Sequence, residues 1–413
     1  MSAESVTIER LGAQGDGIAT IKGDTIYVGF ALPGETVSIT RSGSRGELVS
    51  IDAPSAARTD PPCRHFGPQG DRCGGCSLQH FDLTAYNNWK KALVHDALSA
   101  RGINADVKPP ITCRPGSRRR AVFSARAVKN GLVLGFNRPG THVIANIEDC
   151  GVLTPAIAAA LPGLRRLACI FAHGRKPFRL QVLESLTGLD VAVDGVGKIR
   201  EKARQDAIGQ TLELGYARMS LGTEILVEAR KPVLKFADID VIPPPGGFVQ
   251  ASAEAQETMI GIVDAHLNGA KRIADLFSGC GTFALPLARQ AAVHAVEGDG
   301  AALEALDQAA RHTAGLKPVT VERRDLFRRP LTAAELKKTD GVVFDPPRAG
   351  AQAQASEIAA SGVSKVAAVS CNPATLARDL RILIDGGFKL VSVTPIDQFL
   401  WSPHVEAVAL LER

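Results

Sequence analysis

One cysteine stands where covalent chemistry is most easily placed in this sequence. Residues 366–369, Val-Ala-Ala-Val, predict a buried strand, and the segment 370–373, Ser-Cys-Asn-Pro, leads from it into a predicted helix, 374–380. In parallel α/β sheets ligands bind at the carboxyl ends of the strands, and a thiol beside a helix N-terminus ionises more easily than a free one. Cys371 is therefore a candidate nucleophile. The alternative is a small apolar residue that closes a strand.

Four other cysteines are spaced as metal ligands. Two glycines separate Cys73 from Cys76, which lets two thiolates converge on one metal without crowding by side chains. Cys63 and Cys150 would complete a set of four. The spacing does not distinguish zinc from a [4Fe-4S] cluster, because both accept four thiolates, and free thiols are the third possibility.

A glycine-rich loop follows a predicted strand in the last third of the chain. The strand 272–277 leads into the loop 278–282, Ser-Gly-Cys-Gly-Thr, and then into a predicted helix, 283–292. This order is typical of a Rossmann-like nucleotide site. The loop lacks the third glycine of the dinucleotide fingerprint, which favours a smaller ligand.

Acidic residues end the next predicted strands. Glu297 lies 22 residues after Asp275 (297 − 275), where a carboxylate accepts from both ribose hydroxyls, and Asp325 is placed to reach an adenine amino group. Asp345 ends a further strand. Single acids of this kind are common, but their succession after one glycine loop is the ordering of an S-adenosylmethionine (SAM) methyltransferase. SAM is therefore the predicted cofactor.

Composition and charge set the class of protein. The 413 residues predict two or three domains, and no apolar run approaches the roughly 20 residues that cross a bilayer. We expect a cytoplasmic monomer that does not contact membranes, in which eight cysteines serve metal binding or catalysis rather than disulfides. Net charge is only +5, but basic residues gather at 114–120 and 323–329. Such gatherings attract phosphate backbones; the alternative is a solvated surface.

Strand and helix signals divide the chain into three parts. Short alternating runs at the start predict a small β-barrel, a type of module that often binds nucleic acid. An amphipathic helix is predicted at 81–101, and a hairpin at 121–136 turns at Lys129-Asn130-Gly131 with the arginines at its root. The run Ile-Pro-Pro-Pro-Gly-Gly at 242–247 marks a boundary. The predicted domains are residues 1–54, 55–241 and 242–413.

Taken together, these motifs resemble the RNA uracil-5-methyltransferase family, whose members make 5-methyluridine, and most closely its iron–sulfur-containing 23S ribosomal RNA branch. The turn Leu32-Pro-Gly-Glu35 resembles a TRAM domain, an RNA-binding OB-like module. The resemblance covers the whole chain and rests on Cys73-Gly-Gly-Cys76, Phe248-Val-Gln250, residues 275–281, Asp345-Pro-Pro-Arg348, residues 370–375 and His404-Val-Glu406. Two departures are a nine-residue interval after Cys63, longer than is usual in the family, and Thr282 where relatives often have Asn.

The resemblance implies an α/β fold. It comprises a SAM-dependent class I (Rossmann-like) methyltransferase domain, an N-terminal OB-like β-barrel and a central α+β iron–sulfur domain. The implied cofactors are SAM and a [4Fe-4S] cluster, and the implied partner is RNA, preferably ribosomal. The implied site residues are the cluster ligands Cys63, Cys73, Cys76 and Cys150, the SAM contacts Gln250, Phe277, Thr282, Glu297, Asp325 and Asp345, the nucleophile Cys371 and the base Glu406.

Uracil chemistry gives separate reasons for the last two residue types. Carbon 5 is too weak a nucleophile to take a methyl group unaided, so a thiolate such as that of Cys371 must first add to carbon 6. The remaining proton on carbon 5 must then be removed before the cysteine can leave. Glu406 begins a predicted strand, 405–411, that we expect beside the strand of Cys371. An exposed glutamate at a strand end is the alternative.

Two other functions stay open. The first is 5-methyluridine formation in the tRNA T-loop, although that branch generally lacks the TRAM domain and the cysteines. The second is a non-catalytic RNA-binding module, against which the intact Gln250, Asp345, Cys371 and Glu406 argue. Arg348 follows Pro-Pro where N-methyltransferases usually place an aromatic residue. The particular uridine is not encoded in any recognisable motif.

Overall fold

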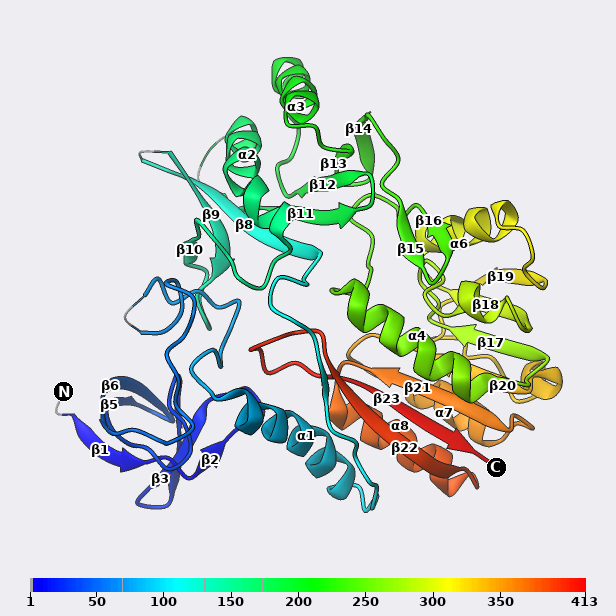
Figure 1. Ribbon diagram of the computed structural model, residues 1–413, viewed down its shortest axis with the longest axis horizontal. Helices are drawn as coiled ribbons and strands as arrows, with labels where there is room; N and C mark the ends of the chain where they lie inside the picture. Colours follow the sequence, from blue (N-terminus) through cyan, green and yellow to red (C-terminus); the bar gives the residue numbers. More distant parts are fainter. Residues whose placement is uncertain (1–2, 69, 130, 173, 175) are drawn as a thin grey trace.

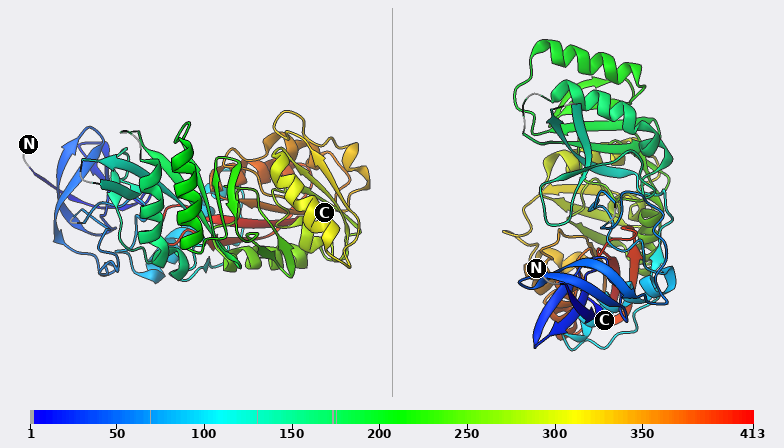
Figure 2. Two further views of the ribbon diagram at one scale, coloured as in Figure 1. Left: turned by 90° about the horizontal axis from the view of Figure 1, so that it is seen from above. Right: turned by 90° about the vertical axis from the view of Figure 1, so that its left-hand side faces the viewer.

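The structure, a computed structural model, describes residues 3–68, 70–129, 131–172, 174 and 176–413. The chain forms three large sheets, which build three lobes (Figure 1). The N-terminal strands and the C-terminal sheet lie at opposite ends when the molecule is seen from above (Figure 2). Among the described residues, no helix is both long and apolar enough to cross a membrane.

The first sheet has six strands in the order β1-β5-β6-β4-β3-β2. Alternating residues point inward, so that Ile8, Ile26 and Ile39 are buried at its centre. Glu35 is fully buried in the turn that resembles TRAM, where Oε2 accepts from the amide of Leu32 over 2.8 Å and the carboxylate pairs with Arg58. The strands are β1 (Glu4–Thr7), β2 (Arg10–Leu11), β3 (Gly17–Ile21), β4 (Asp24–Val28), β5 (Thr36–Ser42) and β6 (Arg45–Ala53).

The second sheet lies in the middle of the chain, and its order is β10-β9-β8-β11-β12-β13-β14. Val128 pairs with Gly131, as the predicted hairpin requires; Asn130 of that turn lies outside the described residues. Its strands are β8 (Arg120–Val128), β9 (Gly131–Asn137), β10 (Ile144–Asn146), β11 (Phe178–Ser185), β12 (Gly188–Asp194), β13 (Arg218–Leu221) and β14 (Glu224–Glu228). Its helices are α2 (Pro155–Phe171) and α3 (Glu201–Glu213), and the small sheet β15 (Leu234–Phe236) with β16 (Ile239–Val241) follows.

The third sheet has eight strands in the order β19-β18-β17-β20-β21-β23-β22-β7. The first five of these are parallel, whereas β23 is antiparallel to both β21 and β22. The strands are β7 (Ile111–Thr112), β17 (Arg272–Leu276), β18 (Ala292–Glu297), β19 (Val319–Arg323), β20 (Gly341–Phe344), β21 (Lys365–Ser370), β22 (Lys389–Asp397) and β23 (Glu406–Glu412).

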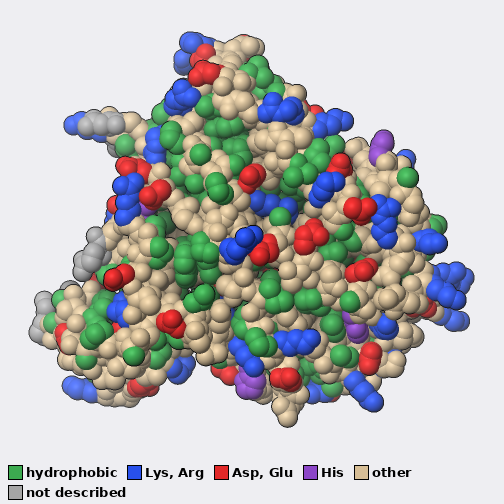
Figure 3. Space-filling model, in the orientation of Figure 1, with side chains coloured by type: hydrophobic (Ala, Val, Ile, Leu, Met, Phe, Trp, Pro, Cys, Tyr) green, Lys and Arg blue, Asp and Glu red, His purple; other side chains and the backbone are tan. Residues whose placement is uncertain are grey.

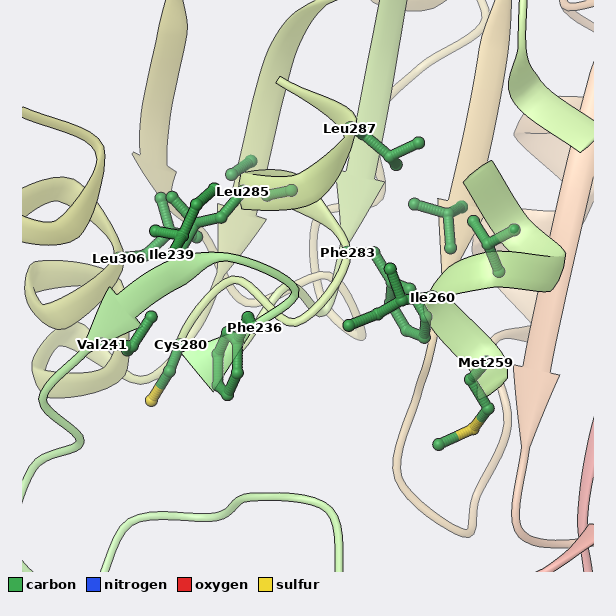
Figure 4. Close-up of a cluster of buried hydrophobic side chains, with 14 of the residues drawn as sticks. Phe236, Ile239, Val241, Met259, Ile260, Cys280, Phe283, Leu285, Leu287 and Leu306 are labelled. Carbon is green, nitrogen blue, oxygen red and sulfur yellow. The ribbon is translucent and has the colours of Figure 1, made fainter. Parts of the chain in front are cut away.

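Helices cover both faces of this sheet because its strands are apolar on both sides. One face packs on α4 (Ala253–Leu267), α5 (Ala284–Leu287) and α6 (Gly300–His312), and Figure 4 shows Met259, Phe283 and Leu285 in that core. The other face packs on α1 (Leu83–Ser99), α7 (Gln352–Ala359) and α8 (Pro373–Asp385), and the short turn η1 (Glu335–Lys338) precedes β20. A sheet covered in this way holds its strand ends rigidly.

Two elements that precede the second sheet belong to the third. Helix α1 begins at the cap Asp82, whose Oδ1 accepts from two amides of the first turn, and its buried residues recur every four positions: Tyr86, Lys90, Val94 and Leu98. This stripe packs on α8 and β22. Strand β7 then pairs with the end of β22. The chain therefore visits the third sheet before it builds the second.

The predicted helix 283–292 is wrong in its extent, because only Ala284–Leu287 is helical. The helix is short because the amides of Arg289 and Gln290 bond three residues back, to the carbonyls of Pro286 and Leu287, so the chain continues through turns to Gln290. The predicted helix at 81–101 and the predicted strands around the glycine loop are confirmed within a few residues.

Candidate active site

Cys371 and Glu406 lie at the same edge of the third sheet. Ser370 at the end of β21 pairs with Ala407 near the start of β23, so the residues just beyond this pair are neighbours. The prediction that the strand of Glu406 runs beside that of Cys371 is thereby confirmed. Asn372 caps α8 by accepting from the amide of Ala374 over 3.1 Å, and its Nδ2 donates to the carbonyl of Arg348. This cap fixes the turn that carries the thiol.

The surroundings of Cys371 raise the pKa of its thiol, so the prediction of easier ionisation is wrong for the free protein. Burial is the largest cause, and the carboxyl groups of Glu406 and Asp345 add to it. Arg348 acts in the opposite direction. These surroundings therefore disfavour the thiolate, and Arg348 partly offsets them.

Glu406 is a buried carboxyl with an unusually high pKa. Only 3% of the residue is exposed, and burial together with the charge of Asp345 raises the pKa to about 8. Its Oε2 accepts from Nε2 of Gln398 over 2.9 Å, whereas Oε1 has no partner among the described residues. Burial likewise raises the pKa of Asp345 to about 7. A carboxyl group thus lies next to the nucleophile, and it can accept a proton once it is ionised.

Two buried glutamines connect these carboxyl groups. Gln250 donates from Nε2 to Oδ2 of Asp345 over 3.0 Å and accepts at Oε1 from Nε2 of Gln398 over 2.7 Å. Sequence reasoning missed Gln398, which follows β22 and stands in no pattern that marks a functional glutamine. The link exists only because β22 and the segment before α4 meet in space.

Glu297 is hydrogen-bonded to the glycine loop. The carboxylate of this residue accepts from the amide of Gly279 over 2.9 Å and from those of Gly298 and Asp299. Gly279 has φ +53° and is followed by Gly281 at +94°, values that glycine adopts without strain. The loop therefore presents backbone rather than side chains at the sheet edge.

Phe277 follows β17 and Asp325 follows β19, two parallel strands that are separated by β18. Phe277 adopts φ +60°, rare for a non-glycine residue, and its ring centre lies 5.4 Å from that of Phe327. Both rings line a cavity of about 410 Å³. Asp325 is exposed and accepts from the amide of Phe327 over 3.0 Å, and Thr282 is half-buried in the glycine loop.

This edge suits SAM. The predicted contacts end four adjacent parallel strands, β17 to β20, or lie in the loop and segment beside them. In addition, the fully buried carboxyl of Asp275 has no hydrogen-bond partner among the described residues. A buried carboxyl without a partner is what a polar ligand with donor groups would satisfy.

The four predicted metal ligands line one cavity of about 910 Å³. Burial and the other nearby thiols raise the pKa of Cys73 to about 11 and that of Cys76 to about 12. Cys63 and Cys150 lie close enough to contribute to both shifts. Within the described ranges, however, no group of three or more His, Cys, Asp or Glu side chains is arranged to hold a metal ion.

The donor set of this cavity fits a thiolate-bound cluster in chemistry. Its four thiols line one cavity, and Arg118, which also lines the cavity, supplies a positive charge beside Cys150 and Cys76. Gly74 is required by close packing, because a Cβ there would lie 2.3 Å from the carbonyl oxygen of Asn137. The cysteine segment therefore rests against β9 with no room for a side chain.

The same segment is attached to the loop before Glu406. The amides of Ser77 and Leu78 both donate to the carbonyl of Trp401, over 2.7 and 3.0 Å. His404 of this loop lines the 910 Å³ cavity, and its Nδ1 lies 2.8 Å from Nη2 of Arg348. Cys371 itself is not among the lining residues. The cavity thus adjoins the sheet edge without containing the nucleophile.

The arginines at 118–120, for which the sequence predicts either contact with RNA or a solvated surface, differ in exposure: Arg119 is buried, whereas Arg118 and Arg120 are half-buried. Arg119 is 7% exposed and donates from Nη2 to Gln256 over 2.7 Å and from Nε to the carbonyl of Gln250. The guanidinium of Arg120 lies 5.2 Å from the ring centre of Phe248. Figure 3 shows Lys and Arg side chains interspersed with Asp and Glu over the face that it presents.

Comparison with known proteins agrees with this geometry. A sequence model described as tRNA (uracil-5-)-methyltransferase matches residues 244–413. A protein of Agrobacterium fabrum named as an RNA methyltransferase is 53% identical, with all of both chains covered. The 23S rRNA (uracil(1939)-C(5))-methyltransferase of Vibrio cholerae is 33% identical, with 99% of this chain and 96% of that protein covered.

A solved structure has the same fold. The tRNA (uracil-54, C5)-methyltransferase of Pyrococcus abyssi, in complex with S-adenosyl-L-homocysteine, superposes with a TM-score of 0.74, covering 99% of this chain and 100% of that one at 21% identity. The predicted α/β fold class is therefore confirmed. Because the match to the Vibrio cholerae enzyme extends along the whole chain and the uracil-5 sequence model matches the third sheet, this chain belongs to the RNA uracil-5-methyltransferase family.

Proposed function

We propose that this protein methylates carbon 5 of a uridine in RNA, with Cys371 as nucleophile and Glu406 as base. The observation that carries the proposal is the pairing of β21 with β23, which sets a thiol and a high-pKa carboxyl side by side at the carboxyl edge of a parallel sheet. An exposed strand-end glutamate, the alternative for Glu406, does not match a residue that is 3% exposed.

Each residue has one task in the proposed reaction. Cys371 loses its thiol proton to solvent, and its Sγ then bonds to carbon 6 of uracil, which shifts the electron pair of the C5–C6 double bond and makes carbon 5 nucleophilic. SAM, when bound, supplies the methyl group to carbon 5. Glu406 then takes the proton that remains on carbon 5, and the electron pair of that C–H bond re-forms the C5–C6 double bond as the Sγ–C6 bond breaks. Arg348 favours the thiolate at the first step.

The proposed SAM site is the edge formed by β17 to β20. The glycine loop offers backbone amides, and Asp275 offers an unsatisfied carboxyl that belongs with a polar ligand. The residues that we propose as SAM contacts are Gln250, Phe277, Thr282, Glu297, Asp325 and Asp345.

The proposed substrate is 23S ribosomal RNA. The relative from Vibrio cholerae, matched along its length, is named for that substrate, whereas the tRNA enzyme from Pyrococcus abyssi is similar in fold. The six-stranded N-terminal sheet supports RNA binding because OB-like modules commonly bind oligonucleotides. Methylation of the tRNA T-loop is the second candidate, favoured by the description of the matching sequence model.

We also propose a [4Fe-4S] cluster held by Cys63, Cys73, Cys76 and Cys150. Four thiols on one cavity beside a cationic guanidinium support it, and thiolates in such numbers are the usual ligands of these clusters. Cys73 and Cys76, the thiols whose pKa is raised to about 11 and about 12, must lose their protons when metal binds. The role proposed for the cluster is structural, because its segment is tied to the loop at Trp401.

A denaturing gel with methyl-labelled SAM and ribosomal RNA fragments tests the chemistry. Wild type should release labelled 5-methyluridine, Cys371→Ala should give neither adduct nor product, and Glu406→Gln should accumulate a labelled protein–RNA adduct. The adduct should resolve slowly rather than never, because a general base typically contributes about 10²–10⁴-fold. Labelled product from Cys371→Ala would refute the nucleophile, and 5-methyluridine found in tRNA alone would move the substrate to the second candidate.

A further inference from the structure

Gln398 occupies a central position between the base and the proposed SAM site. The residue is 4% exposed and makes three hydrogen bonds with its side-chain amide. Oε1 accepts from the amide of Ala251 over 2.9 Å, and Nε2 donates to Oε1 of Gln250 over 2.7 Å and to Oε2 of Glu406 over 2.9 Å. Both hydrogens of the amide group are therefore used.

The direction of these hydrogen bonds is fixed by the backbone. Since the amide of Ala251 can only donate, it must face the oxygen of Gln398, and the nitrogen must face Glu406. The opposite orientation would set the oxygen of Gln398 against the oxygens of Glu406 and Gln250. Gln250 in turn has to donate to Asp345. The backbone amide of Ala251 thus fixes the orientation of the Gln398 side chain and, through it, that of Gln250.

We propose that Gln398 is a positioning residue that holds Oε2 of Glu406 and so presents Oε1 as the atom that takes the proton from carbon 5. The inference rests on the proposed function and adds a residue to it. Oε1 has no partner among the described residues, as an oxygen reserved for the substrate requires. The second hydrogen of Gln398 ties the base to Gln250 and hence to the edge where SAM is proposed to bind.

The charges that face Glu406 define what the loss of Gln398 would do. Asp345 from the end of β20 raises the pKa of Glu406, the thiol of Cys371 lies beside it, and Arg348 is the cation near that thiol. Burial is the largest cause, whereas the hydrogen bond from Gln398 lowers the pKa. Without this donor, the pKa of Glu406 rises further and the carboxylate forms only at higher pH.

The test uses the full-length protein and follows how fast the methylated adduct resolves as pH is raised. Gln398→Met and Gln398→Leu both remove the two donor hydrogens at similar volume without adding a group that titrates. Each should resolve the adduct about ten- to a hundredfold more slowly at neutral pH, which is less than the loss of the base itself. The midpoint of the pH profile should rise by about one unit or more, with the rate recovered at alkaline pH.

A matched control separates positioning from mere packing. Gln290 lies in the same domain and donates from Nε2 to Asp264 over 2.8 Å, away from the sheet edge. Gln290→Met should keep the wild-type midpoint. A uniform loss of rate at every pH in both Gln398 variants, with the midpoint unchanged, would refute the proposal.

An infrared measurement keeps the inference independent of the reaction. The carbonyl band of protonated Glu406, assigned by its loss in Glu406→Gln, should titrate at higher pH in Gln398→Met than in the wild type. If wild type makes no 5-methyluridine, the proposed function fails while this band still reports on Gln398. If this band titrates at the same pH in Gln398→Met and in the wild type, the hydrogen bond from Gln398 does not control the pKa of Glu406.

Discussion

Lys90 of α1 and Asp397 at the end of β22 form a buried ion pair, with 2.9 Å between Nζ and Oδ1 and neither side chain exposed. Tyr86 donates to the other oxygen of Asp397 over 2.6 Å, and Lys90 also donates to the carbonyl of His404. Two residues of α1 therefore hold both ends of the loop that lies between Gln398 and Glu406. The position of the proposed base therefore depends on a helix that is distant in the sequence, because Lys90 and Asp397 are 307 positions apart.

Replacing Lys90 by Met should destabilise the protein by about 3–5 kcal/mol, because Asp397 is left as an unpaired buried charge. Urea unfolding monitored by circular dichroism measures the change. Lys202→Met breaks a surface pair with Asp206, where Lys202 is 85% exposed, and should alter stability by less than about 0.5 kcal/mol. Equal effects of the two substitutions would contradict the importance given to the buried pair.

Stability should fall with rising pH because of Glu406. Its folded pKa of about 8 lies above the ordinary value of 4.5, so the stabilising contribution is complete below about 4.5 and is lost as pH rises through about 8. Thermal unfolding of wild type should therefore decline over this window more steeply than that of Glu406→Gln. Glu412→Gln, an exposed change on the same strand, should follow wild type. Parallel curves for wild type and Glu406→Gln would show that this carboxyl is not protonated in the folded state.

Protein purified without oxygen should contain about four irons per chain and be brown. Gly74→Ala should lower the iron content, because the added Cβ would lie 2.3 Å from the carbonyl oxygen of Asn137 and displace the cysteine segment. Gly151→Ala, one residue from Cys150, meets nothing within 4 Å and should retain iron. A stoichiometric amount of zinc without iron, measured by plasma emission spectroscopy, would show that the four cysteines hold zinc and not a cluster.

Arg119→Met should weaken SAM binding and stability while the salt dependence of RNA binding stays unchanged. The reason is that Arg119 is buried and holds the carbonyl of Gln250 and the side chain of Gln256. Arg114, which is 82% exposed in its side chain, serves as the contrasting variant. If Arg114 contacts a phosphate, Arg114→Met should reduce the steepness of the plot of log K for RNA binding against log salt concentration by about one, without changing the stability of the protein. A reduced slope for Arg119→Met would show that Arg119 contacts a phosphate after all.

The order of strands around the glycine loop was predictable from local signals. Apolar runs such as Val366 to Val369 are buried on both faces, and glycines that adopt positive φ mark the loop between them. The neighbouring positions of Cys371 and Glu406 followed from the expectation that two buried strands pair. Local patterns of this kind depend on a few adjacent residues, which is why they can be recognised in one sequence.

Long-range polar contacts were not predictable in the same way. Lys90 occupies a core position of α1 although lysine is rarely buried, and its partner stands far along the chain. Arg119 belongs to a run that looks basic and solvated but turns inward to meet α4. Gln398 has no neighbour in sequence that marks its role. Each of these residues is explained by a partner that only the fold brings close.

The interleaving of early and late segments has a consequence for synthesis on the ribosome. Strand β23 is inserted between β21 and β22. The amides of Ser77 and Leu78 bond to Trp401, which is made more than 300 residues later. The cysteine segment, α1 and β7 therefore have partners, in α8, β22 and the loop at Trp401, that are synthesised only near the end of the chain. Contacts of such large sequence separation slow folding and leave apolar surface exposed in the meantime, so the nascent chain is a natural client for chaperones.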